Sequence, residues 1–198
     1  MATNYGELKT EIAEWLDRED LLTKIPHFIR FAERSIFRKL RIPANERVAR
    51  YTVTTETALA IPNDYLEARS MMVNNVPVIR VSDIYAQNYA NTNGSPRYFG
   101  RVGGEFIFKP GIEAGDIVTM NYWFDESGMS VDTDTTNILR VADDLYIYGA
   151  IMEAEKFLGS EERIGQTKAV FEAKLNTVQN MADMAELSGS TSEVQNAY

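Results

Sequence analysis

The sequence predicts an α+β fold in which helices at the two ends of the chain enclose a β-rich middle. Three observations predict it. At both ends of the 198-residue chain, apolar residues recur every three or four positions, as on one face of a helix. In the middle, short runs rich in β-branched and aromatic residues alternate between apolar and polar positions. Asn-Asn and Gly-Gly pairs separate several of these runs, which is typical of hairpins.

Two helices are expected in the N-terminal segment. Thr3 or Asn4 can cap the first, whose apolar stripe consists of Leu8, Ile12, Trp15 and Leu16. The second begins near Pro26, because proline is tolerated in the first helical turn, and should end before Pro43. Its apolar face consists of Ile25, Ile29, Ala32, Ile36 and Leu40.

Four arginines form another stripe on this second helix, roughly opposite the apolar one. They are Arg30, Arg34, Arg38 and Arg41, at spacings that keep them on one side of a helix. One interpretation is an ordinary solvated face. The other is a ladder that faces an acidic partner surface, because guanidinium groups suit planar, bidentate ion pairing.

The middle of the chain predicts about six antiparallel strands. Residues 47–53 are expected to pair with 57–61 as a hairpin. Two further hairpins are expected, at Asn74-Asn75 and at Gly103-Gly104. A last strand covers residues 117–124, and Ser82 is placed to cap a short intervening helix.

Helical periodicity returns after residue 136. One helix should end near Gly159, and another should begin directly after it. We therefore expect residues 1–44 and 137–186 to pack together as a helical bundle, with residues 45–136 as the β-rich insert. Residues 187–198 form a polar tail with no core of its own.

The formal net charge of −9 is distributed unevenly. Residues 1–50 carry ten Lys/Arg against eight Asp/Glu, whereas residues 111–198 carry five against sixteen. Overall acidity argues against binding nucleic acid through a broad basic surface. A mildly basic start and a strongly acidic end are compatible with head-to-tail packing of copies. Acidic surface that keeps the protein soluble is the alternative.

The candidate motifs for catalysis, metal binding and cofactor binding each lack residues that such a site requires. The chain has no cysteine and one histidine, His27, which excludes thiolate and multi-histidine sites. Residues 132–137 resemble the start of a calcium loop, but Asn137 replaces the required glycine and Asp143 the bidentate glutamate. Residues 100–104 lack the Gly-Lys-Ser/Thr ending of a phosphate loop.

The sequence predicts neither a membrane-spanning segment nor an export signal. It contains no run of about 18 consecutive apolar residues. Its first residues have neither the basic region nor the apolar stretch of a secretory signal. We therefore expect synthesis in a cytoplasm and no membrane partner.

Several segments match, in order and spacing, the motifs of one known protein family. The N-terminal segments are residues 5–18 and 25–33, which resemble the opening helix pair of that family. Ile61-Pro62-Asn63-Asp64-Tyr65 resembles its Pro-x-Asp-Tyr element, and Gly94-Ser95-Pro96-Arg97-Tyr98 its stretch before a hairpin. Residues 121–124, 136–139 and 144–150 are similar to its last strand and penultimate helix. Over residues 4–180 the chain thus resembles the head-to-tail adaptor (connector) family of short-tailed bacteriophages.

This resemblance implies a non-catalytic virion subunit without cofactors. Such adaptors form a ring, expected to be dodecameric, between the capsid portal and the tail or nozzle proteins. DNA passes through the ring without sequence-specific binding. The implied location is the virion neck, after synthesis in the bacterial host cytoplasm. The arginine stripe and the acidic residues 111–198 are then candidate subunit-interface faces.

A C-terminal extension often reaches along the portal in related adaptors. The corresponding candidates for portal binding in this chain are Val194, Gln195, Asn196 and Tyr198. Two alternatives remain open at this point. One is another neck or tail-completion ring subunit, and the other is a small hydrolase that uses His27, Asp64 or Asp144.

Overall fold

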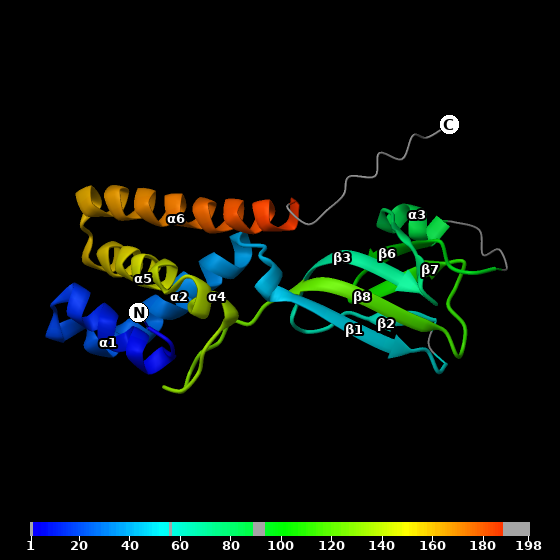
Figure 1. The fold of residues 1–198 in the computed structure, drawn as a ribbon, viewed down its shortest axis with the longest axis horizontal. Coiled ribbons are helices and arrows are strands. Elements are labelled where there is room, and N and C mark those ends of the chain that lie inside the picture. The colour runs from blue at the N-terminus through cyan, green and yellow to red at the C-terminus, as the bar shows by residue number, and fades with distance from the viewer. Residues whose placement is uncertain (1, 56, 89–93, 188–198) are drawn as a thin grey trace. The chain divides into compact units, whose positions relative to one another are not determined.

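A computed structural model describes residues 2–55, 57–88 and 94–187, and it confirms a mixed α+β protein (Figure 1). The chain divides into two compact units. A helical unit contains the described parts of residues 1–45 and 126–198, and a β unit consists of Glu46–Asp125. Residues 126–136 therefore belong to the helical unit, whereas we expected them at the end of the β-rich insert.

The helical unit begins with helix α1 (Tyr5–Leu16). The Asn4 side chain caps it by accepting a hydrogen bond of 2.9 Å from the N–H of Glu7. Asp17, in the left-handed conformation with φ 47°, ends it. The 3-10 helix η1 (Glu19–Lys24) leads into α2 (Ile25–Lys39), which carries proline in its first turn.

The other helices of this unit are formed by the C-terminal part of the chain. They are α4 (Asn137–Val141), α5 (Asp143–Leu158) and α6 (Glu161–Leu187). Helix α5 contacts α1, α2, α4 and α6, so it lies at the centre of the unit. Its Leu145, Tyr146 and Ala150 are fully buried in a core shared with α1 and α2.

The β unit contains two four-stranded sheets. The first, in spatial order, consists of β1 (Glu46–Thr52), β8 (Ile117–Phe124), β3 (Tyr65–Val73) and β4 (Val76–Pro77). The second consists of β2 (Ala58–Ala60), β7 (Glu105–Lys109), β6 (Tyr98–Val102) and β5 (Ile79–Arg80). One core joins the sheets, with Phe99, Phe106 and Phe108 packed against side chains of β3 and β8. Helix α3 (Asp83–Asn88) lies close to Gly100 of β6.

The strand arrangement differs in three ways from the sequence expectation. The described residues form eight strands and not about six, and β5 runs parallel to β6. The expected hairpin between residues 47–53 and 57–61 is wrong, because β1 pairs with β8 and β2 pairs with β7. The hairpins at Asn74-Asn75 and Gly103-Gly104 are confirmed. No helix of the described residues combines the length and apolarity needed to cross a membrane.

We predict that Gly149→Val lowers the free energy of unfolding by about 1–3 kcal/mol, because overpacking displaces neighbours. A Cβ at Gly149 would lie 2.8 Å from the Ala32 Cβ atom and 3.2 Å from the Phe171 ring, so α2, α5 and α6 meet at this point. The matched control is Gly165→Ala on α6, where no heavy atom lies within 4 Å of the added Cβ. This control should gain about 0.5–1 kcal/mol from helix propensity. Urea unfolding curves check both changes, and equal effects would contradict the packing argument.

Candidate assembly surfaces of the helical unit

Three arginines form a row on the exposed side of α2. Arg30, Arg34 and Arg38 are all exposed to solvent. Within the described chain, no carboxylate lies within the 4.0 Å ion-pairing distance of any of the three. The Arg30 guanidinium lies 5.8 Å from the centre of the Phe31 ring, which is itself 46% exposed. This side of α2 therefore combines unneutralised positive charge with an exposed aromatic ring.

Arg41, the fourth arginine of the predicted stripe, lies apart from this row. Helix α2 ends at Lys39, so the helical spacing no longer applies at Arg41. Its guanidinium donates to the carbonyl oxygens of Phe37 and Leu40, at 3.0 and 2.9 Å. Its backbone also exchanges two hydrogen bonds of 2.8 Å with the side chain of Gln179 on α6. Arg41 thus caps α2 and links it to α6.

The surroundings of the arginine row contain little negative charge. Glu33 is the single acidic residue of α2, and it is buried, with one carboxylate oxygen accepting from the N–H of Gly128 at 2.9 Å. A shallow pocket beside the row is lined by Phe31, Arg34, Ser35, Arg38, Lys39 and, from α5, Glu153. The Glu153 carboxylate forms an ion pair with Lys156 of the same helix, with 2.7 Å between Oε1 and Nζ. The pocket is therefore basic.

The exposed side of α1 carries the opposite charge. Glu7, Glu11 and Glu14 follow one another at helical spacing, and a shallow pocket along this side is lined by them together with Trp15 and Asp132. Trp15 is 57% exposed, although its ring contacts Tyr148 edge to face at 5.8 Å. Our sequence analysis placed Trp15 in the apolar stripe and missed the glutamate row. The i, i+4, i+7 spacing was the available signal.

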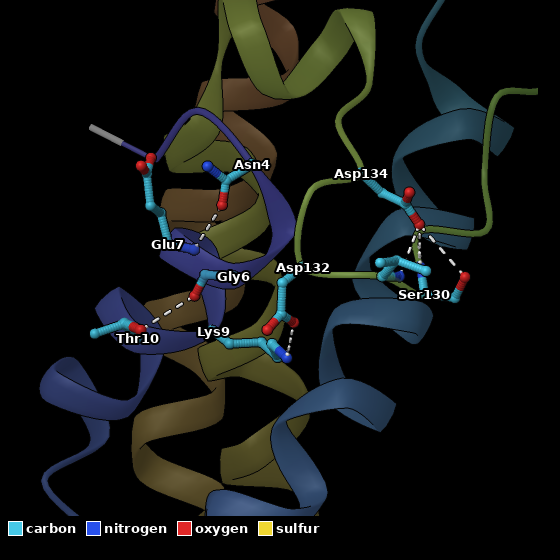
Figure 2. Close-up of polar contacts among 9 residues, drawn as sticks. Asn4, Gly6, Glu7, Lys9, Thr10, Ser130, Asp132 and Asp134 are labelled. Atoms are coloured by element: carbon cyan, nitrogen blue, oxygen red, sulfur yellow. Dashed lines mark hydrogen bonds and ion pairs between the residues drawn. The ribbon is translucent and has the colours of Figure 1, made fainter.

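The N-terminus of α1 is held by the loop that returns from the β unit. The N–H groups of Tyr5 and Gly6 donate to the carbonyl oxygens of Asp134 and Asp132, at 2.8 and 2.9 Å. Figure 2 shows Lys9 of α1 and Asp132 of the loop pointing toward each other, with their charged atoms 2.6 Å apart. Two otherwise unpaired N–H groups of the first helical turn are thus satisfied.

Asp134 shapes this loop through its own carboxylate. One oxygen accepts from the backbone N–H groups of Ser130 and Val131, at 2.7 and 2.8 Å (Figure 2). These hydrogen bonds hold the pKa of Asp134 below its ordinary value. Both acidic residues of the calcium-like segment therefore have structural partners. Among the described residues, no three Asp, Glu or His side chains are grouped to hold a metal ion.

The residues considered for hydrolysis lie in different places. His27 is exposed in the first turn of α2, and Asp144 forms an ion pair of 2.6 Å with Lys174. Asp64, in the β unit, pairs with Arg47 and accepts from the Tyr122 hydroxyl at 3.1 Å. The pKa of the Tyr122 hydroxyl is raised, mainly because the group is buried and secondly because it lies beside the Asp64 carboxylate. Val194, Gln195, Asn196 and Tyr198, the tail candidates, lie outside the described residues.

A family model described as SU10 adaptor protein matches residues 3–195 of the chain. No curated protein matches it.

We predict that Asp134→Asn makes the protein less stable at pH 7, because a neutral amide oxygen accepts the two loop hydrogen bonds more weakly than a carboxylate. A carboxyl group with a lowered folded-state pKa stabilises the fold above its unfolded pKa, about 4, and loses this effect as the pH falls through the folded pKa. The difference from wild type should therefore shrink below about pH 4. Denaturant unfolding between pH 7 and pH 2 tests this, and a constant difference would show that the ionised form contributes nothing.

Proposed function

Because the chain belongs to the SU10 adaptor protein family, we propose that it forms a ring that joins the portal of a bacteriophage capsid to the tail. It is a structural protein of the virion. In the proposed assembly, the ring is dodecameric, lies in the virion neck and contacts the portal on one side and the tail or nozzle proteins on the other. The family match over nearly the whole chain is the observation that carries this proposal.

The exposed arginine row on α2 supports assembly from many copies. Arg30, Arg34 and Arg38 have no ion-pair partner in the described part of their own chain. A ring is built from heterologous contacts, in which two different faces of each copy meet. A positively charged face that lacks counter-charges fits such a contact better than it fits an isolated monomer. We propose the α2 row as part of the subunit interface.

The overall charge supports passage of DNA through the ring without sequence-specific binding. A net charge of −9 leaves no excess of cations to hold phosphates along a channel. A weakly repelling channel lets the double helix slide. The match to a family of structural adaptors supports a non-enzymatic role. Synthesis would take place in the cytoplasm of the bacterial host.

We predict that the full-length protein binds rings of the portal protein from the same phage. Purified portal rings should shift to a heavier species in sedimentation when the protein is added, and image averaging should reveal an added ring at one end. Absence of any binding to portal rings would contradict the proposal.

We predict that deletion of residues 188–198 weakens portal binding and leaves the melting temperature unchanged. The deletion removes only sequence beyond the end of α6, so no described helix or strand loses a residue. A full-length control with alanine at Val194, Gln195, Asn196 and Tyr198 separates side-chain contacts from tail length. Titration of both variants against portal rings measures the effect, and wild-type affinity in both would rule out a docking role for the tail.

A further inference from the structure

We infer that the glutamate row of α1 in one copy docks on the arginine row of α2 in the next copy. The glutamate row is Glu7, Glu11 and Glu14, and the arginine row is Arg30, Arg34 and Arg38. This inference rests on the proposed ring and identifies the two helix faces that meet within it. It replaces the acidic residues 111–198, our earlier candidate, as the partner of the arginines.

The two rows match in sign and in length. At about 100° per residue, the three glutamates fall within about 60° of arc on α1 and the three arginines within about 80° on α2. At a rise of 1.5 Å per residue, the rows are about 10 Å and about 12 Å long. Each glutamate can therefore face one arginine when the helices lie side by side.

Each helix carries a single side chain whose charge is opposite to that of its row. Lys9 is the single cation of α1, and it is paired with Asp132 at 2.6 Å. Glu33 is the single carboxylate of α2, and it is 2% exposed and bonded to Gly128. Like charges at i, i+4 repel each other and destabilise a helix. Contact between the rows removes this repulsion on both helices and adds bidentate ion pairs.

An exposed aromatic ring accompanies each row. Phe31 lies beside the arginines and is 46% exposed, and Trp15 lies beside the glutamates and is 57% exposed. A contact between the rows would also bury part of both rings. Aromatic residues and arginine are the types most enriched at protein interfaces, so this combination favours a protein partner.

A second copy fits the arginine row better than the same chain. In the described chain, no α1 carboxylate lies within ion-pairing distance of Arg30, Arg34 or Arg38. An α1-to-α2 contact leaves each copy with one further α1 face and one further α2 face, so the contact can propagate around a closed ring. An exposed ion pair contributes little on its own, so one contact is weak and a complete ring multiplies it.

Complementary charge reversal tests the contact with the full-length protein on portal rings. The first variant is Glu11→Lys/Glu14→Lys, which spares Glu7 because its carboxylate accepts from Thr3. The second variant is Arg34→Glu/Arg38→Glu. We expect each variant alone to lose ring assembly at least tenfold at low salt, and less at high salt, because salt screens exposed charges.

The decisive outcome is whether combining the two variants restores ring assembly. An equimolar mixture of the two variants should assemble, because reversed and native faces alternate around a ring with an even number of copies. A chain that carries all four substitutions should assemble with itself at any copy number. The matched control is Glu162→Lys/Lys168→Glu on the exposed side of α6, which should assemble like wild type.

Cysteine cross-linking gives a second measurement that does not depend on charge. The chain has no cysteine, so Glu14→Cys in one preparation and Arg34→Cys in another introduce the only thiols. Mixed on portal rings in the presence of an added mild oxidant, the two should form a disulfide-linked dimer, whereas Lys168→Cys with Arg34→Cys should not.

The outcomes separate this inference from the proposed function. If wild-type protein fails to assemble on portal rings, the proposed function fails. If wild type assembles but charge reversal has no effect, or neither the mixture nor the four-substitution chain regains assembly, the α1-to-α2 contact is overturned. Absence of the mixed disulfide in assembled rings overturns it as well.

Discussion

The structure depends on one constraint, which is that helices from opposite ends of the chain share a single core. Helix α5 is buried between α1 and α2 from the N-terminal segment and α6 from the C-terminal segment. The close approach at Gly149 leaves no room for a side chain between α2 and α5. Hydrogen bonds from Ala2 to Asp143 and between Arg41 and Gln179 close the same unit at its surface. Apolar faces of α1 and α2 are therefore used inside, and their charged outer faces are left for contacts with other molecules.

Much of this arrangement could be predicted from local signals, and the remainder could not, for physical reasons. Hydrophobic periodicity predicted α1, α2, α5 and α6, and Asn-Asn and Gly-Gly predicted two hairpins, because these features depend on residues close together in the sequence. The partner of β1 could not be predicted in this way, since β8 lies some seventy residues later and tertiary packing selects it. Strand β5 has two residues, too few for any periodic signal.

The candidate surfaces show the same division between local and non-local information. Helical spacing placed Arg30, Arg34 and Arg38 on one face of α2, where the structure has them exposed. It also included Arg41, whose orientation depends instead on where the helix ends and on Gln179, far along the chain. The glutamate row of α1 escaped notice because charge was summed over residues 1–50. An acidic helix and a basic helix in that window nearly cancel.

The chain passes from the helical unit into the β unit at the start of β1 and returns at the end of β8. These two points are neighbours, since Glu46 at the start of β1 pairs with Trp123 near the end of β8. An insertion whose two ends lie side by side can change in length or be exchanged without rethreading the domain that hosts it. Evolution can therefore vary the β unit to suit new partners while the host helices keep their core. Changes in the β unit and preservation of the helical core then become separable problems within one polypeptide.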